Sequence, residues 1–344
     1  MHDLNNYSEI LQQAVEHNTF DIVPLTASFA VNFQCTSRCR YCWIWKEQMD
    51  ELPLSDMISV VDQLAALGVK AVSLSGGEPL LRYDLPEIIA RIRSHGMIAN
   101  ITTNGLLFRT PRLERAVRAG LNSIALSLDT VDPVVYQWIR GVPLAPVLEG
   151  LHTILAMMNE QPGLQVSANC VVSRANINHI MELVEYCETW RIPVGFQPLH
   201  LAGVWGETER EQLRFTKQDM PVLNSLFREL IELRDQGYHI SNDRAYLCGF
   251  PDFLVYHRLP NDFKCTTGFT TIAIDHRLNV RSCWSMDPIG NLRETSLDEL
   301  WHSEMYRQRR EDMLALACPR CWLRCHTEHC SPEWIREFVR WVKQ

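Results

Sequence analysis

The chain has 344 residues, of which 46% are apolar and 22% charged, and its formal net charge is −8, the balance of an ordinary globular protein. A net negative charge without any Lys/Arg-rich run argues against nucleic-acid binding, and the lack of a long uncharged apolar stretch or a basic, apolar N-terminus argues against a membrane span or signal peptide. We therefore expect a cytoplasmic protein whose partners include neither nucleic acid nor a membrane.

Segment 25–200 alternates short apolar, β-branched runs with amphipathic stretches of helical period. This pattern is typical of repeated strand–helix units that build a parallel sheet. The spacing predicts that Ser55 caps the first of these helices and that Gly68, Gly96 and Gly120 follow helix ends in the left-handed conformation. The predicted strands are Ala27–Gln34, Ala71–Ser75, Ile98–Thr103, Ser123–Ser127, Gln165–Val172 and Val194–Pro198, and the predicted helices are Ser55–Leu67, Leu85–His95, Arg112–Ala119, Ala145–Met158 and Ile180–Trp190.

Six strands are too few to close an eight-stranded barrel, so the sequence predicts an α/β fold with a partial (β/α)6 TIM-like barrel; a doubly wound sheet is the alternative. In either fold, ligands bind at the carboxyl ends of the parallel strands. Residues 248–330 are rich in loops and cysteines and have too little periodic apolar sequence for a core without metal. The predicted divisions are an N-terminal helical extension at 1–24, the barrel at 25–200, a connector at 201–247 with one helix near Met220–Gln236, and a small cysteine-rich domain at 248–344, identified below as an iron–sulfur domain by resemblance, that closes with a helix over Pro332–Gln344.

Three cysteines, Cys35, Cys39 and Cys42, directly follow the first predicted strand. Three thiolates can bind three irons of a [4Fe-4S] cluster and leave the fourth iron open to a small molecule. A structural zinc site normally has four protein ligands. A zinc loop completed by a distant histidine such as His95 is therefore the alternative interpretation.

This cysteine motif resembles the signature of the radical S-adenosylmethionine (SAM) superfamily, C-x3-C-x2-C with an aromatic residue before the last cysteine, a place that Tyr41 fills. The resemblance extends over about residues 25–200. It implies a [4Fe-4S] cluster that reductively cleaves SAM, and a 5'-deoxyadenosyl radical that takes a hydrogen atom from the substrate. It also implies an electron donor such as flavodoxin or ferredoxin.

The strand ends that follow carry the side chains that this resemblance implies for SAM. Adjacent glycines after the second strand let the backbone approach a ligand, and the carboxylate of Glu78 can accept hydrogen bonds from the SAM ammonium group. Hydroxyl and carboxylate groups at Ser127 and Asp129 suit the ribose and amino-acid parts of SAM, and Arg174 suits its carboxylate. The implied cofactor-binding residues are Tyr41, Gly76, Gly77, Glu78, Thr103, Asn104, Ser127, Asp129, Asn169 and Arg174, with Ser173 and Gln197 as further candidates.

A second group of cysteines, in 265–330, resembles the SPASM and Twitch extensions of radical SAM enzymes, which bind auxiliary iron–sulfur clusters. A hairpin is expected between Thr271 and Cys283, with Asn279 able to supply positive φ in its turn. One auxiliary [4Fe-4S] cluster is favoured; two clusters and a four-cysteine zinc ribbon are the alternatives. The implied ligands are Cys265, Cys283, Cys318 and Cys321, with Cys325 and Cys330 as alternative ligands.

The remaining cysteines divide into two groups. Cys170 and Cys187 are expected to be buried core residues, whereas Cys248 is a candidate thiol hydrogen-atom donor, a role known in similar peptide epimerases. Its other interpretations are a core residue or an extra cluster ligand. We expect a radical SAM oxidoreductase that modifies a peptide by epimerisation or cross-linking. A sugar or aminoglycoside dehydrogenase is the first alternative, and a non-catalytic iron–sulfur electron carrier is the second.

Overall fold

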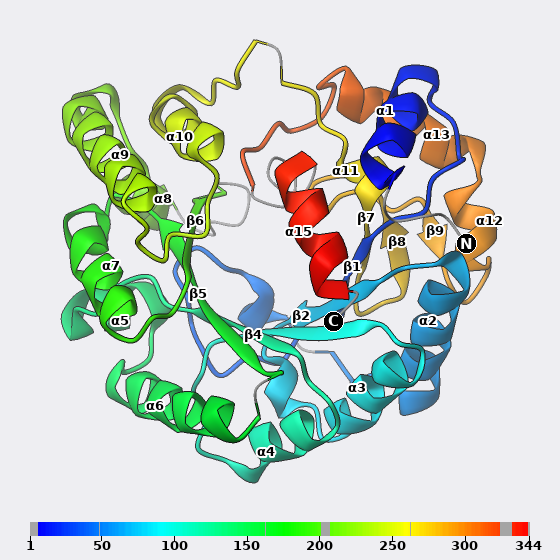
Figure 1. Cartoon of the computed structure of the whole chain (residues 1–344), viewed down its shortest axis with the longest axis horizontal. Coiled ribbons are helices and arrows are strands. Elements are labelled where there is room, and N and C mark those ends of the chain that lie inside the picture. Colours follow the sequence, from blue (N-terminus) through cyan, green and yellow to red (C-terminus); the bar gives the residue numbers. More distant parts are fainter. Residues whose placement is uncertain are drawn as a thin grey trace.

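The computed structural model describes residues 6–47, 49–161, 163–200, 207–261, 263–323 and 332–342. Its centre is a nine-stranded sheet in the order β6-β5-β4-β3-β2-β1-β7-β8-β9. Figure 1 shows that the sheet curves into an incomplete ring with helices around its outside, which confirms the partial barrel. The strands are β1 (Thr26–Asn32), β2 (Ala71–Gly76), β3 (Ile98–Thr103), β4 (Ser123–Ser127), β5 (Gln165–Val172), β6 (Val194–Pro198), β7 (Thr271–Ile274), β8 (Asn279–Arg281) and β9 (Gly290–Asn291).

The helices of the barrel alternate with these strands, and further helices lie at both ends of the chain. Those within the barrel region are α2 (Leu54–Leu67), α3 (Leu85–Ser94), α4 (Pro111–Arg118), α5 (Pro133–Arg140), α6 (Ala145–Glu160) and α7 (Ile180–Thr189). The others are α1 (Tyr7–His17), α8 (Glu207–Leu213), α9 (Met220–Asp235), α10 (Arg244–Tyr256), α11 (Thr267–Thr270), α12 (Leu297–Trp301), α13 (Glu304–Leu314) and α15 (Pro332–Val342).

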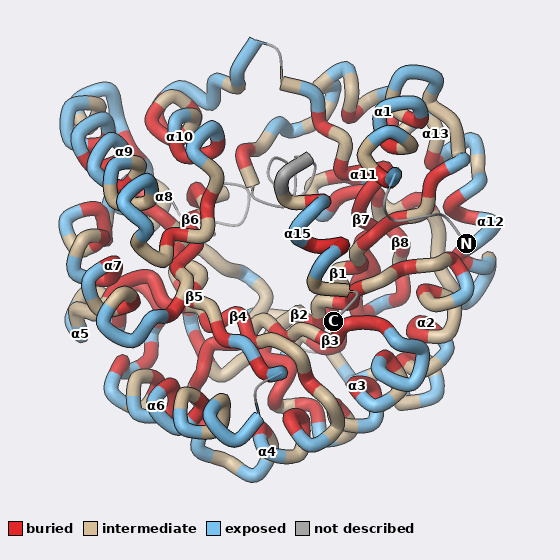
Figure 2. The backbone as a smooth tube through the Cα atoms, viewed as in Figure 1, coloured by how far each residue is buried: buried red, intermediate tan, exposed pale blue. Residues whose placement is uncertain are grey.

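Each barrel strand has one face toward the helices and one toward the inside of the ring. In β5 the even-numbered residues from Val166 to Val172 are buried, whereas Ser167, Asn169 and Val171 between them are only half-buried. This alternation follows from the two-residue period of a strand. Figure 2 shows the same division in the whole molecule, with buried residues on the strands and exposed residues on the outer sides of the helices.

The predicted strands β3 to β6 have the observed bounds, and the three glycines expected after helices have φ of 100°, 72° and 102°. Two local predictions were wrong. Pro53, and not Ser55, occupies the cap position of α2, where no side chain caps the helix. In the turn between β7 and β8 the positive φ of 67° belongs to Leu278, and the Asn279 side chain donates to Asp275 at 3.0 Å.

Residues 248–330 were predicted to be rich in loops, but the described part of this region forms helices and contributes to the main core. β7 pairs in parallel with β1, and the hydroxyls of Thr26 and Thr271 lie 2.9 Å apart. Trp301 and Tyr306 are fully buried in the same hydrophobic core as the barrel. The C-terminal region therefore gains its core by extending the barrel sheet, which its own sparse apolar pattern did not indicate.

The closing helix α15 agrees with the prediction, and Cys170 and Cys187 are buried as expected. Within the described residues, no single helix is both long and apolar enough to cross a membrane. Only α5 and α6 taken together reach that length and apolar composition, and the two helices are bent by 100° relative to each other.

Candidate functional site

The first cysteine loop leaves the carboxyl end of β1, where the loop after β2 holds it. The amides of Gly77 and Glu78 donate to the carbonyls of Asn32 and Gln34 at 3.0 and 2.7 Å. A Cβ atom added at Gly76 would lie 2.2 Å from the Asn32 oxygen, and one at Gly77 would lie 2.1 Å from the Gln34 oxygen. Two backbone segments in contact thus require both glycines, whether or not a ligand is bound. Contact of the glycines with SAM stays a prediction.

The Glu78 carboxylate is buried and holds the loop that follows β3. It accepts hydrogen bonds from the Leu80 amide at 3.1 Å, the Thr103 hydroxyl at 2.8 Å and the Asn104 amide at 2.8 Å. Burial raises the pKa of Glu78 to about 7, although these three hydrogen bonds oppose the rise. Glu78 and Thr103 are 0% and 2% exposed. Their side chains therefore position the loop, and the expected contacts of both with SAM stay predictions.

Asn104 connects the loop after β3 to the cysteines. Its side-chain nitrogen donates to the Thr36 hydroxyl at 2.9 Å and lies 3.7 Å from the Cys35 sulfur. Its side-chain oxygen accepts from the Leu106 amide at 3.1 Å. Asn104 is thus in direct contact with the segment that the sequence predicted to bind the cluster.

The thiols of Cys35, Cys39 and Cys42 all have raised pKa values, and burial is the main cause in each. The pKa of Cys42 is raised to about 11, with a contribution from the other two thiols. Thiolates are the form that binds metal, so a bound cation would be needed to stabilise them in this buried loop. Three soft sulfur donors on one loop fit a [4Fe-4S] cluster with one iron left open.

His95, the fourth ligand of the alternative zinc loop, is elsewhere. Its Nε2 lies 2.8 Å from Asp62, and it follows α3 at the amino end of β3, whereas the cysteine loop follows the carboxyl end of β1. Since β1, β2 and β3 are parallel, these positions are at opposite ends of the strands. The structure therefore excludes His95 as a partner of the three cysteines.

Asp129 is fully engaged by other groups of the protein. Arg140 donates two hydrogen bonds to its carboxylate at 2.6 and 2.9 Å, and the Tyr41 hydroxyl and the Val171 amide each donate one at 2.9 Å. Four donors fill the four lone-pair positions of a carboxylate, and Asp129 has no exposed surface. Asp129 and Tyr41 therefore contact other residues of the protein, whereas the sequence suggested that they contact SAM.

Sequence reasoning missed Arg140, the last residue of α5. Its side chain is buried, and its Nη1 lies 3.8 Å from the Cys39 sulfur. The carbonyls of Ile139 and Arg140 accept hydrogen bonds from the amides of Arg40 and Arg38, both at 2.9 Å. The end of α5 therefore holds the cysteine loop through its backbone and through one side chain.

Ser127 and Asn169 are register partners on β4 and β5. Both are half-buried, and neither side chain hydrogen-bonds to another residue in the described part of the chain. Arg174 instead lies 3.3 Å from Asp219, with 45% of its side chain exposed, and the Ser173 hydroxyl bonds to Asn176. Ser127 and Asn169 are therefore the stronger candidates for SAM, and the role of Arg174 stays a prediction.

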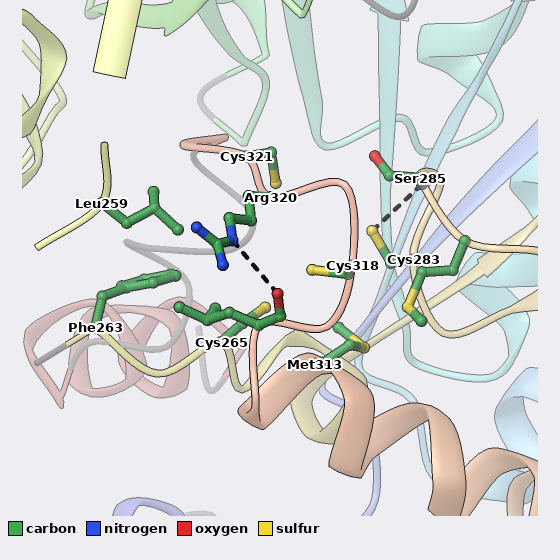
Figure 3. Close-up of a pocket in the computed structure, with 11 residues that line it drawn as sticks. Leu259, Phe263, Cys265, Cys283, Ser285, Met313, Cys318, Arg320 and Cys321 are labelled. Carbon is green, nitrogen blue, oxygen red and sulfur yellow. Dashed lines mark hydrogen bonds between the residues drawn. The ribbon is translucent and has the colours of Figure 1, made fainter. Parts of the chain in front are cut away.

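A second group of four cysteines lines one cavity (Figure 3). Cys265 precedes α11, Cys283 follows β8, and Cys318 and Cys321 follow α13. Burial raises the pKa of Cys321, and the thiols of the other three cysteines raise it further. Much of the remaining wall is apolar and includes Phe263. The structure thus brings together the four cysteines that the sequence favoured as ligands of one auxiliary cluster.

A zinc ion and a cubane cluster would space the four sulfurs differently, and the zinc ribbon stays the alternative for this cavity. Four sulfurs around one zinc ion lie within about 3.8 Å of one another, because each Zn–S bond is about 2.3 Å. A cubane cluster separates them, since each sulfur binds a different iron. Among the described residues, no three His, Cys, Asp or Glu side chains are arranged to hold a single metal ion. The alternative ligands Cys325 and Cys330 lie outside the described residues.

Arg310 supports the loop that carries Cys265. This arginine is 0% exposed and donates to the carbonyls of Gly268 at 3.0 Å and Thr19 at 3.1 Å. Four aromatic rings surround its guanidinium, with centroids 4.3 to 5.0 Å away. Arg310 therefore ties the N-terminal segment to α13 and to the start of the second cysteine group.

Cys248 lies on α10 and is exposed, so the core interpretation of this thiol was wrong. The helix itself is fixed to the second cysteine group. The Tyr246 hydroxyl donates to the Trp322 carbonyl at 2.9 Å, and the Trp322 indole donates back to the Tyr246 carbonyl at 3.0 Å. Because Trp322 follows Cys321 directly, the exposed thiol is carried by a helix that is anchored beside the second cysteine group.

Comparison with family models gives two matches. The radical SAM superfamily matches residues 31–187, and the SPASM iron–sulfur cluster-binding domain matches residues 265–326. The first match contains the cysteine loop, the Gly-Gly-Glu loop and Arg140. The second contains the four cysteines of the cavity.

Two curated relatives and two solved structures show how far the similarity extends. The PqqA peptide cyclase of Xanthomonas campestris pv. campestris (strain 8004) is 27% identical over 301 residues, covering 82% of this chain and 75% of the relative. That of Granulibacter bethesdensis is 28% identical over 216 residues, covering 61% and 56%.

Streptococcus suis SuiB bound to its precursor peptide SuiA has a TM-score of 0.67 at 18% identity, covering 93% of this chain and 74% of that chain. The structure of anSMEcpe with bound AdoMet has a TM-score of 0.65 at 15% identity, covering 93% and 95%. At these identities the structural likeness concerns the fold alone.

Proposed function

The chain belongs to the radical SAM superfamily and carries a SPASM domain, and from this premise we propose that it cross-links or epimerises residues of a peptide. One observation carries the proposal. The three-cysteine loop follows the carboxyl end of β1, and the four-cysteine cavity lies at the amino end of β7, the strand beside it. A substrate inside the ring would then lie between two redox centres.

The protein is an enzyme that uses a [4Fe-4S] cluster and SAM. When bound, the reduced cluster supplies the electron that cleaves SAM, and the resulting 5'-deoxyadenosyl radical abstracts a substrate hydrogen atom. We assign Cys35, Cys39 and Cys42 as ligands of this cluster, and Ser127 and Asn169 as contacts of SAM. The protein residues orient these groups and keep water from the radical.

The second cysteine group is proposed to bind one auxiliary [4Fe-4S] cluster through Cys265, Cys283, Cys318 and Cys321. The shared cavity and the mutual effects of these thiols on the Cys321 pKa support this set. A buried cluster between apolar walls can accept an electron from a substrate radical, and such an acceptor is needed for cross-linking, which is a net oxidation.

The peptide substrate is supported by the relatives, since the curated ones are named PqqA peptide cyclases and SuiB was solved with a precursor peptide. We further propose that the protein acts in the cytoplasm and that a one-electron donor such as flavodoxin or ferredoxin reduces the first cluster. The exposure of Trp43, which follows Cys42 and is 41% exposed, supports an approach of the donor from this side of the loop.

Cys248 distinguishes the two peptide chemistries. Epimerisation needs a hydrogen atom returned to the substrate radical, and an exposed thiol can donate one. Cross-linking needs an electron acceptor and no thiol donor. We therefore propose that Cys248 is the donor if the product is an epimer, with the position of α10 beside the second cysteine group in support.

The test is anaerobic reconstitution followed by incubation with SAM, reductant and candidate precursor peptides. Cross-linking removes two hydrogen atoms from the peptide, whereas epimerisation leaves the mass unchanged but introduces deuterium from deuterated water. Cys248→Ala should stop epimerisation and leave cross-linking intact, with Cys39→Ala as the inactive control. An iron-loaded protein that forms no 5'-deoxyadenosine, or one that acts on a sugar and on no peptide, would overturn the proposal.

A further inference from the structure

The Asp129–Arg140 ion pair is buried beside a cysteine of the first cluster loop. Side-chain exposure is 0% for Asp129 and 7% for Arg140. A buried ion pair often contributes little net stability, because both charges lose their hydration. Apolar side chains of similar size would fill the same space, so stability alone does not explain why two charges stand here.

The contact with the cysteine loop gives the pair another role. Arg140 Nη1 lies 3.8 Å from the sulfur of Cys39, while two other guanidinium nitrogens bond to Asp129. The guanidinium fork is rigid and planar, so fixing two of its nitrogens also fixes the third. Asp129 in turn is held by Tyr41 and Val171. Arg140 is therefore a cation held at one cysteine sulfur by a carboxylate that other protein groups fix in place.

We propose that Arg140 raises the reduction potential of the cluster bound through Cys39, and that Asp129 is the positioning residue that orients this cation and offsets part of its charge. The proposal depends on the radical SAM chemistry of the chain and not on a peptide substrate. When the cluster is reduced, an external donor loses one electron and the cluster gains it, so the reduced cluster carries one additional negative charge.

The direction of the effect follows from charge and hydrogen bonding. A positive charge stabilises the more negative, reduced cluster, and an N–H donor to a ligand sulfur acts in the same direction, because both disperse negative charge. Burial keeps water and salt from screening these interactions. The Asp129 carboxylate acts in the opposite direction, and the two effects therefore have opposite signs.

The loop geometry makes this arrangement specific to Arg140. The amides of Arg38 and Arg40 bond to the last two carbonyls of α5 at 2.9 Å, which fixes the distance between the helix end and Cys39. A Cβ atom added at Gly141 would lie 2.8 Å from the Arg38 side chain. Arg40 differs from Arg140, since its side chain is 34% exposed, pairs with Glu209 and lies over the Trp138 ring.

The experiment is an anaerobic redox titration of the reconstituted full chain without substrate, followed by electron paramagnetic resonance. The SAM-binding cluster is identified as the signal that changes when SAM is added. Arg140→Gln should shift its potential to a more negative value, and Asp129→Asn should shift it to a more positive value. Arg140→Lys, which keeps the charge, should lie between wild type and Arg140→Gln. Arg40→Gln, which removes a more exposed charge from the same loop, should shift the potential less than Arg140→Gln.

Shifts of opposite sign support the proposal, because a general loosening of the loop would move both variants in the same direction. Shifts of the same sign, or no shift in fully iron-loaded Arg140→Gln, overturn it. If Arg140→Gln does not hold iron, the sign for Asp129→Asn decides: a positive shift supports the proposal, and no shift or a negative one overturns it. Since no peptide is present, failure of the peptide assay leaves these outcomes unchanged.

Discussion

Replacing Gly77 by alanine should separate the ends of β1 and β2 and displace the first cysteine loop. The added Cβ atom would lie 2.1 Å from the Gln34 carbonyl oxygen and 2.6 Å from its carbon. These are backbone atoms, so no side-chain rotation can relieve the contact. The backbone must shift, and the shift stretches the hydrogen bonds from Gly77 to Asn32 and from Glu78 to Gln34. Cys35, the residue after Gln34, moves with them.

The expected cost can be worked out from these contacts. Each backbone hydrogen bond contributes about 1 kcal/mol, and forcing atoms into filled space costs about 1–3 kcal/mol. We therefore expect Gly77→Ala to lower the free energy of unfolding by about 3–5 kcal/mol, measured by urea denaturation of the iron-free protein. Iron bound by the first loop after reconstitution should also fall.

Gly163→Ala is the matched control, because a Cβ atom there would meet nothing within 4 Å. This variant should change the free energy of unfolding by less than about 0.5 kcal/mol. If Gly77→Ala unfolds at the same urea concentration as Gly163→Ala and binds as much iron, the close approach of β1 and β2 is not what requires glycine at this position.

Three further predictions concern other parts of the site. Burial raises the pKa of Glu78 from its usual 4.5 to about 7, so the folded protein holds this proton more tightly than the unfolded chain does. The contribution of Glu78 to the free energy of unfolding should therefore fall by about 3 kcal/mol as the pH rises from about 4.5 to about 7. Urea titrations across this range should show the loss in wild type and not in Glu78→Gln. If the free energy of unfolding changes equally with pH in both proteins, the prediction is wrong. Arg310→Met should lower the free energy of unfolding by about 2–5 kcal/mol, because the buried carbonyl of Gly268 and the half-buried carbonyl of Thr19 lose their donor, whereas Arg258→Met, at a side chain that is 63% exposed, should have almost no effect in the same assay. Cys321→Ala should remove about four iron atoms per chain if the cavity binds one [4Fe-4S] cluster; a loss of zinc, or of about eight iron atoms, would rule out that cluster count.

The sequence was sufficient for the barrel and for the cysteine groups, for reasons visible in particular residues. Each barrel strand is a short apolar run, and glycines such as Gly68 and Gly120 end the helices between them. α5 was missed because Pro133–Arg140 is only eight residues long and follows a strand end without a long periodic pattern. Proline at its start and glycine at its end are the signals that could have identified it.

The roles of the polar residues were harder to predict than their positions. A carboxylate at a strand end can bind a ligand or another residue, and the choice for Asp129 depends on Arg140, eleven residues away on a helix that was not predicted. Ser127 and Asn169 have no such partner among the described residues, so their side chains stay available. Local patterns indicate which residues reach the carboxyl ends of the strands, but side-chain direction decides which of them can meet a ligand.

The burial of the thiols gives a reason why so many motif residues contact the protein itself. Burial raises the pKa of Cys39 and Cys42, which favours neutral thiols, and neutral thiols attract nearby cations only weakly. The loop must therefore be held by bonds that do not depend on the cluster. Asn104 bonded to Thr36, and the end of α5 bonded to Arg38, provide them. A loop arranged in advance loses less conformational entropy when iron binds, and Asn104, which the sequence suggested as a cofactor contact, contributes to this arrangement through Thr36.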